Sequence, residues 1–251
     1  MSAEKASAIV LRTVEFMETS LVVTLFTREF GKVQGLAKGA RRLKGPFESA
    51  IDLLALCRIV FLRKSSDALD LVTEAKLQRR FRPAGRSLSS LYAGYYVAEL
   101  LNELTDDYDP HPELFDLADE SLLALSSGEP VATRVARFEL VALRILGHLP
   151  SLETCVDCGV RVPLTGRVTF GQLDGGVLCP QCRGGKRQLV AVGAGVLRAM
   201  GQLADPAGQA WRRLQLDAKS RGELRGLMNR YLCNLLGRKP RMHQYLGMLS
   251  S

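Results

Sequence analysis

Residues 21–38 decide the fold, and they read Leu21-Val22-Val23-Thr24-Leu25-Phe26-Thr27-Arg28-Glu29-Phe30-Gly31-Lys32-Val33-Gln34-Gly35-Leu36-Ala37-Lys38. Both ends of this stretch are short and rich in Val, Leu, Phe and Thr, which is typical of strands, and Glu29-Phe30-Gly31 between them predicts a tight turn. Three similar segments, 8–13, 53–62 and 68–77, lie in the same part of the chain. Five strands without helix-length segments between them predict a small closed barrel of the OB type, although other five-stranded barrels share this pattern.

A basic loop separates the predicted third and fourth strands, at residues 38–46. Four of its nine residues are cationic, and glycines and a proline shape its backbone. Because loops at the rim of OB barrels bind nucleic acid, we predict phosphate contacts here. A solvated loop without a special role is the alternative. The predicted DNA contacts are Lys32, Lys38, Arg41, Arg42 and Lys44, extended toward the helices by Arg79 and Arg80.

Four phenylalanines of this region could stack on bases, but aromatic residues in alternating strands are more often part of a core. We therefore expect Phe26, Phe30 and Phe61 to be packed in a core. Phe47 follows Pro46 in the basic loop, which makes it the best candidate for an exposed stacking residue.

The pattern becomes helical after Pro83. Between 130 and 146, for example, apolar residues recur at 131, 135, 138, 142 and 145, which forms one face of a packed helix. The predicted helices are 87–104, 113–125, 130–146, 194–203 and 217–236. The sequence thus predicts an α+β chain: a barrel at 1–80, and a helical domain at 81–150 and 191–251. A module at 151–190 is inserted between the third and fourth helices.

The inserted module contains two C-x-x-C pairs, Cys155-Val156-Asp157-Cys158 and Cys179-Pro180-Gln181-Cys182, about twenty residues apart. This spacing predicts a zinc site with Cys155, Cys158, Cys179 and Cys182 as ligands. Four thiolates leave no position for a substrate, so we predict one structural Zn²⁺ that holds a short hairpin together. Disulfides are the alternative. Residues 1–20 show no signal-peptide pattern, so we expect this chain in the reducing cytoplasm. Disulfides are disfavoured there.

The charge of the chain is +8 and is distributed unevenly. Residues 1–80 carry 14 Lys and Arg against 9 Asp and Glu, residues 81–150 carry 5 against 11, and residues 151–251 carry 15 against 6. Because basic surfaces attract phosphate backbones, we predict a second DNA-binding surface in the last third. Its predicted residues are Arg212, Arg213, Arg221 and Arg225. No apolar run approaches the ~18 residues of a membrane span, so we expect no membrane contact.

We find no convincing catalytic set and expect a protein that is not an enzyme. The three histidines stand alone beside turns or near the terminus, and the phosphate-binding loop and nucleophile-elbow motifs are absent from the sequence. Two alternatives stay open. One is a zinc-ribbon adaptor that contacts only proteins. The other is a zinc-stabilised deacetylase of the sirtuin type, which also combines paired cysteines with a turn such as Gly193-Ala194-Gly195.

Several motifs together resemble a known family, the bacterial recombination mediator RecO. Segments 8–11, 18–23, 25–33 and 37–42 look like its OB-domain signature. Phe138-Glu139-Leu140 and Leu146-Gly147-His148-Leu149-Pro150, which lead into the first cysteine pair, look like its helical domain entering the zinc module. Gly175-Gly176 before Cys179 also fits, and the resemblance extends over nearly the whole chain.

The resemblance implies a non-catalytic DNA-repair protein of the cytoplasm, associated with the nucleoid. RecO proteins bind single- and double-stranded DNA and anneal complementary strands. With RecR they place RecA on strands coated by single-stranded-DNA-binding protein (SSB). Contact with the acidic tail of SSB would require a cation beside an apolar groove. Arg134 and Arg137 are the candidates, although they could simply pair with neighbouring acids.

Overall fold

The structure is a computed structural model, and it describes residues 2–42, 45–47, 50–64 and 68–246. The chain divides into two compact units, Met1–Arg134 and Val135–Ser251. The division predicted from the sequence, with boundaries near 80, 150 and 190, stays a prediction. Within the described residues, no helix is both long and apolar enough to span a bilayer.

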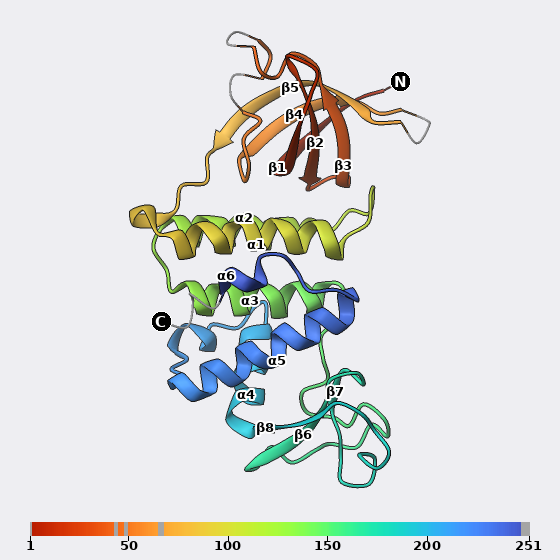
Figure 1. Cartoon of the computed structure of the whole chain (residues 1–251), viewed down its shortest axis with the longest axis vertical. Helices are drawn as coiled ribbons and strands as arrows, with labels where there is room; N and C mark the ends of the chain where they lie inside the picture. The colour runs from red at the N-terminus through yellow and green to blue at the C-terminus, as the bar shows by residue number, and fades with distance from the viewer. Residues whose placement is uncertain (1, 43–44, 48–49, 65–67, 247–251) are drawn as a thin grey trace. The chain divides into compact units, whose positions relative to one another are not determined.

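The first unit begins with a closed barrel of five strands, which confirms the predicted OB-type fold (Figure 1). The strand order is β1-β2-β3-β5-β4, and β3 pairs with β5 in parallel while the other pairs are antiparallel. The parallel pair forms because the chain crosses over between β3 and β5. The strands are β1 (Ala3–Phe16), β2 (Ser20–Thr27), β3 (Gly31–Ala37), β4 (Leu56–Leu62) and β5 (Asp70–Arg79).

Alternate residues of the strands fill the barrel interior, as the pleat of a strand requires. Val23, Leu25, Val33 and Phe61 are all fully buried there. Phe47 is also packed in this core, with 2% of its surface exposed, so our expectation of an exposed stacking residue at this position is wrong. Burial of a large aromatic side chain is strongly favourable, which accounts for the inward position of Phe47.

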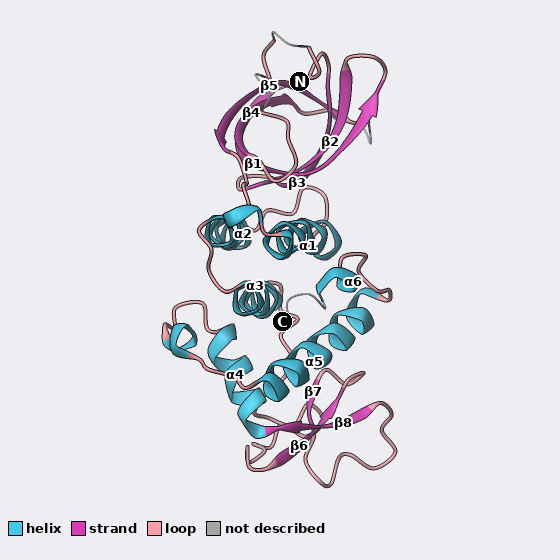
Figure 2. Cartoon of the chain, turned by 60° about the vertical axis from the view of Figure 1, so that its left-hand side comes forward, coloured by secondary structure: helices cyan, strands magenta, loops and turns pink. Residues whose placement is uncertain are grey.

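Two helices complete the first unit: α1 (Leu88–Leu104) and α2 (Pro112–Ser126), preceded by the short 3₁₀ helix η1 (Ala84–Arg86). The side chain of Ser87 caps α1 by accepting a hydrogen bond from the backbone N–H of Ser90. Proline is favourable in the first turn of α2, because the backbone N–H at that position has no hydrogen-bond partner within a helix and proline lacks it. The two helices lie side by side along the barrel, with α1 in contact with β1 and α2 in contact with β2 (Figure 2).

The second unit contains most of α3 (Val131–Ile145), and also α4 (Ala194–Ala204), η2 (Ala210–Arg213), α5 (Ala218–Leu236) and α6 (His243–Leu246). A buried ion pair joins α3 to α5, because Arg225 donates to both carboxylate oxygens of Glu139 at 3.0 and 2.7 Å. Asp217 caps the start of α5, and Gly237 ends it in the left-handed conformation. All five predicted helices are therefore present, with ends within a few residues of those expected.

A small antiparallel sheet lies between α3 and α4 in the sequence. Its strands are β6 (Arg167–Gly171), β7 (Gly176–Val177) and β8 (Leu189–Gly193), in the order β7-β6-β8. The first two form the hairpin that we expected between the cysteine pairs. Strand β8 was not expected. It continues directly into α4 at Ala194, so the hairpin is hydrogen-bonded to the segment that starts the next helix.

Candidate nucleic-acid interface and metal centre

The outer face of β1, β2 and β3 includes Lys32 and leads to the basic loop that begins with Lys38, and it can be described from the strand register. Residues opposite one another on neighbouring strands point to the same side of the wall. Near the β1–β2 turn, Phe16 lies opposite Ser20, and Val22 lies opposite Leu36. Toward the other end of the same strands, Phe26 lies opposite Lys32. The face therefore has two halves, which we call the turn half and the helix half.

The helix half is covered by the unit's own helices. Phe26 is completely buried and stacks on Phe115 of α2, with 6.2 Å between ring centroids and 30° between ring planes. Beyond the end of β2, Arg28 donates to the two carboxylate oxygens of Asp116 at 2.8 and 3.0 Å. This hydrogen-bonded guanidinium lowers the pKa of Asp116. At Gly31, a Cβ atom would lie 2.1 Å from the carbonyl oxygen of Asp109, so the close approach of this turn requires glycine.

Lys32 holds the end of α1 against the barrel. Its Nζ donates to the carbonyl oxygens of Asn102 and Thr105 at 2.9 and 2.6 Å, and Asp107 lies 3.7 Å away. These carbonyls belong to the C-terminal end of α1, where a cation is favoured. Only 12% of the Lys32 side chain is exposed. The structure thus uses this ammonium group for an internal contact, and we remove Lys32 from the proposed phosphate contacts.

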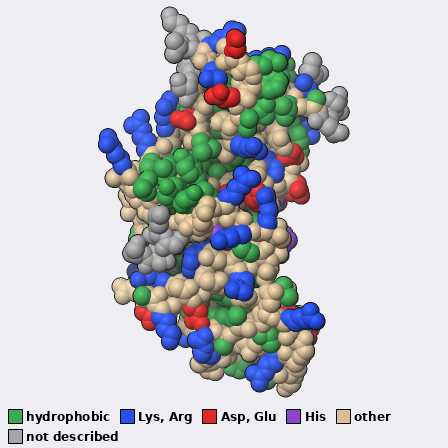
Figure 3. All heavy atoms as spheres, viewed as in Figure 1, with side chains coloured by type: hydrophobic (Ala, Val, Ile, Leu, Met, Phe, Trp, Pro, Cys, Tyr) green, Lys and Arg blue, Asp and Glu red, His purple; other side chains and the backbone are tan. Residues whose placement is uncertain are grey.

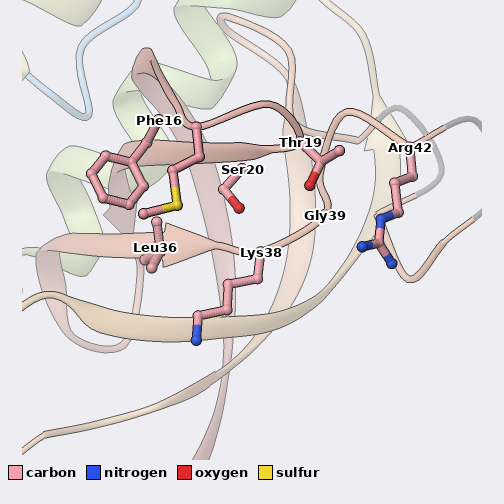
Figure 4. A pocket seen from close by; sticks show the side chains of 8 residues that line it. Phe16, Thr19, Ser20, Leu36, Lys38, Gly39 and Arg42 are labelled. Carbon is pink, nitrogen blue, oxygen red and sulfur yellow. The ribbon is translucent and has the colours of Figure 1, made fainter.

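The turn half is open and contains a pocket of about 530 Å³. The pocket runs from the Phe16 ring and Leu36 past Lys38 to Arg42 (Figure 4). Phe16 is 41% exposed, and Met17, beside it in the β1–β2 turn, is 77% exposed. The residues that line the pocket are Phe16, Met17, Thr19, Ser20, Leu36, Lys38, Gly39 and Arg42.

Backbone hydrogen bonds fix the cationic wall of this pocket. The N–H of Arg41 donates to the carbonyl oxygen of Thr19 at 3.1 Å, which joins the basic loop to the β1–β2 turn. The N–H of Arg42 donates to Gly39, whose φ of 76° is readily adopted by glycine. The Arg41 side chain pairs with Glu15 at 3.1 Å. Lys38 and Arg42 are exposed, and within the described parts of the chain neither makes an ion pair.

The space-filling view shows where hydrophobic and cationic side chains lie on one face of the molecule (Figure 3). Over the barrel, hydrophobic side chains and Lys or Arg side chains lie next to one another on the face seen in Figure 3. OB-type barrels bind oligonucleotides on the β2–β3 face and at the β1–β2 turn, with aromatic residues beside cations. The pocket has this position and this combination of residues.

The four paired cysteines come together in the second unit. Their sulfur atoms all lie within 4.8 Å of one another. Each pair bends around this point in a tight turn: the N–H of Gly159 donates to Cys155 at 2.9 Å, and the N–H of Cys182 donates to Cys179 at 3.1 Å. The cluster therefore has the ligand number and the compactness of a closed tetrahedral site, and it can bind a metal ion.

The pKa shifts of Cys155 and Cys182 also fit a bound cation. The backbone of Cys179 lowers the pKa of Cys155 to about 6, so this sulfur readily becomes a thiolate. The neighbouring sulfurs of Cys179 and Cys158 raise the pKa of Cys182. Crowded thiols of this kind resist becoming thiolates together unless a positive ion offsets their charge. Four soft sulfur ligands in a tetrahedron are the donor set that zinc prefers.

Comparison with known proteins gives the relationship of this chain. The family profile described as Recombination protein O N terminal matches residues 1–81, and the one described as Recombination protein O C terminal matches residues 85–244. The chain belongs to the RecO family. A DNA repair protein RecO from Rhodopirellula baltica is 42% identical, covering 95% of this chain and 97% of the relative.

More distant relatives match over the same extent. Proteins named DNA repair protein RecO from Anaeromyxobacter dehalogenans and Moorella thermoacetica are 34% and 30% identical and cover 98% and 97% of this chain. The matches cover 96% and 90% of the lengths of these two relatives. Membership of the RecO family gives this chain a role in recombination and DNA repair.

The structure distributes the other cations predicted for the barrel as follows. Lys38 and Arg42 line the pocket and Arg41 pairs with Glu15, whereas Lys44 lies outside the described residues. Arg79 pairs with Asp119 of α2, and Arg80 lies 3.9 Å from Asp52. Among the predicted barrel cations that the structure describes, Lys38 and Arg42 therefore share one site with the aromatic residue of the RecO-family barrel.

In the second unit, three of the four predicted cations are exposed. Arg212 and Arg213 lie on η2, and Arg221 lies in the first turn of α5, where it donates to the Leu216 carbonyl at 2.8 Å. Arg225 differs, because its side chain is only 16% exposed and is held by the fully buried Glu139. Removing one partner of such a buried pair is strongly destabilising, so we treat Arg225 as structural.

The two predicted partner-binding arginines are also internal. The Arg134 side chain is 2% exposed and pairs with Glu120 and Glu129, as the alternative interpretation expected. Arg137 donates to the carbonyl oxygens of Leu203, Asp205 and Pro206 at 3.1, 2.9 and 3.0 Å, beyond and at the end of α4. Both guanidinium groups already stabilise the helices of this RecO-family chain, which leaves little of either surface to a peptide.

Sequence reasoning missed Phe16 and Met17. Phe16 is the last residue of β1 and Met17 follows it, and nothing in their residue types separates an exposed strand end from a buried one. A signal was present in the spacing, because the turn connecting two OB strands lies where such barrels bind ligands. The RecO-family pocket became visible only when β3 and the basic loop were placed beside that turn.

Proposed function

We propose that this chain binds single-stranded DNA on the turn half of the barrel face. The pocket that joins Phe16 to the exposed cations Lys38 and Arg42 carries this proposal. Cations neutralise phosphates and release condensed counterions, which supplies most of the affinity of sequence-independent binding. Arg41 extends the same wall, although its pairing with Glu15 must be exchanged for a phosphate.

We extend the proposal to the activities implied by the family: binding of double-stranded DNA and annealing of complementary strands. Annealing requires that two strands be held while their mutual repulsion is neutralised. The exposed cations Arg212, Arg213 and Arg221 of the second unit supply a second surface for this purpose. The chain would act without catalysing a reaction. Together with RecR, it would help to load RecA onto strands coated by SSB.

The proposed role of the cysteine cluster is to hold one structural Zn²⁺. The metal would supply the folding free energy of the module, which has only a three-stranded sheet of its own. Two neighbouring contacts support a bracing role. Lys186 bridges Asp157 of the first cysteine turn and Asp174 of the hairpin, at 3.1 and 2.9 Å. DNA contacts are assigned to other parts of the chain.

Fluorescence anisotropy with a labelled single strand at several salt concentrations tests the proposal. The double variant Lys38→Glu/Arg42→Glu is expected to weaken binding at least tenfold at low salt. It should also make the slope of log affinity against log salt less steep by about 1.4, because each phosphate contact contributes about 0.7 for single strands.

The matched control is Arg58→Glu/Lys76→Glu, which makes the same charge change on β4 and β5 of the same barrel. If the two double variants lose affinity equally, only net charge matters and the turn half is not the site. If the wild-type chain does not bind DNA even in dilute buffer, the proposed function fails altogether.

A further inference from the structure

We propose that the apolar end of the pocket receives an unpaired base, so that Phe16 and Met17 make the turn half selective for single strands over duplex DNA. This inference rests on the proposed function and adds a specificity-determining role for two residues. A cationic surface alone binds any phosphate backbone. Discrimination requires a contact that only an unstacked base can make.

Phe16 lies where folding alone does not require an aromatic residue. It is the last residue of β1, and its cross-strand neighbour is Ser20, whose short side chain covers little of a ring. The ring is 41% exposed, and Leu36 lines the same end of the pocket. Exposed apolar side chains that gather at one pocket with a polar rim are typical of binding sites.

Met17 adds a second apolar group at an unusual backbone position. Its φ is 56°, a left-handed conformation that is uncommon for residues other than glycine, asparagine and aspartate. The turn thus places a long, flexible, highly exposed side chain where glycine would be the easier choice. A thioether packs well against flat aromatic groups, so the residue suits a ring such as a nucleobase.

The composition of the pocket matches the repeating chemistry of a single strand. Phe16 lies at one end, and Lys38 and Arg42 lie further along the same wall (Figure 4). Met17, the next residue after Phe16, also lines the pocket. A strand alternates flat apolar bases with anionic phosphates, and every base has a face on which an aromatic ring can stack. In a duplex the bases are paired and stacked on each other. Its phosphates would contact Lys38 and Arg42, but no base would enter the apolar end of the pocket.

An acidic peptide with apolar residues shares part of this chemistry. The observations favour a nucleic acid, because the pocket lies on the β2–β3 face and the β1–β2 turn, where OB barrels bind oligonucleotides. The peptide is therefore an outcome of the test: an acidic, phenylalanine-containing peptide that displaces the strand from wild type but not from Phe16→Ala would overturn the assignment.

The experiment compares three labelled ligands of about 15 nucleotides, within the range that one OB fold covers. They are an oligothymidine strand, a strand of the same length with abasic sites, and a duplex. For the wild type we expect the oligothymidine strand to bind about tenfold more tightly than the abasic strand, which corresponds to one good stacking contact. Phe16→Ala should reduce this ratio to about one, whereas Phe16→Tyr, which keeps an aromatic ring, should preserve it.

Leu123→Ala is the matched control, since Leu123 of α2 is 46% exposed and lies outside the pocket. It should leave all three affinities unchanged. Equal binding of oligothymidine and abasic strands by the wild type would overturn the inference but leave the proposed function intact. So would an equal loss of affinity for all three ligands in Phe16→Ala. Absence of any DNA binding would instead reject the proposed function.

Discussion

Lys32 and Lys38 are the same residue type on the same side of the same barrel wall, six positions apart, yet their surroundings differ completely. Lys32 caps the end of α1 and is 12% exposed, whereas Lys38 is exposed at the rim of a pocket. The helix half of the face is used for folding, and the turn half is left for a ligand. The comparison shows that a barrel face which looks uniform in sequence is divided by the helices that follow it.

The largest expected effect tests whether binding belongs to the barrel at all. Removal of metal by a chelator, or Cys158→Ser, should unfold residues near 151–193, because structural zinc sites contribute roughly 10–16 kcal/mol. Hydrogen exchange would show lost protection there and unchanged protection in β1–β5. DNA affinity of the turn half should stay within about twofold.

Cys233→Ser is the control, since Cys233 is a cysteine of α5 outside the cluster. If DNA affinity falls in step with metal loss, the binding surface extends to the module, and the contrast between the two halves of the barrel loses its functional meaning.

The next effect compares the two outer phenylalanines. Phe26→Ala should destabilise the first unit by about 3–5 kcal/mol, because it removes a fully buried ring that stacks on Phe115. Phe16→Ala should change stability by no more than about 0.5 kcal/mol, as expected at an exposed position. Urea denaturation measures both. A large loss for Phe16→Ala would show that its ring supports the barrel and is not held ready for a base.

The smallest expected effect compares the two lysines directly. Lys32→Ala leaves two carbonyl groups at the end of α1 without their donor, which should cost about 1–3 kcal/mol of unfolding free energy. Lys38→Ala should be nearly neutral for stability but should weaken DNA binding. The reverse assignment of the two effects, measured by denaturation and anisotropy, would contradict the division of the face.

The elements of the molecule followed well from local sequence. Strand alternation, the turn at Glu29-Phe30-Gly31 and the helical spacing after Pro83 are short-range signals, so the barrel and the five helices were predicted with only their ends misplaced. Strand β8 was missed because Leu189–Gly193 is short and becomes a strand only by pairing with β6. The division into domains with boundaries near 80, 150 and 190 stays a prediction.

The roles of individual cations could not be predicted well from the local sequence, for a physical reason. From the sequence, an Arg or Lys is predicted to be a surface charge. Its actual role depends on which carbonyl or carboxylate group lies within hydrogen-bond distance in the folded chain. Glu139 lies 86 positions from Arg225, and Asn102 lies 70 positions from Lys32. Such long-range partners convert apparent surface cations into internal contacts.

What the sequence determined by itself is therefore the set of parts: a five-stranded barrel, a helical region and two cysteine pairs spaced for one metal. These depend on periodicity and on spacings within a few tens of residues. The tertiary structure alone decided which cations remain available, because only packing of α1 and α2 on the barrel covers one half of its face. The same packing leaves Phe16 beside Lys38 and Arg42, and it is this neighbourhood that makes a site.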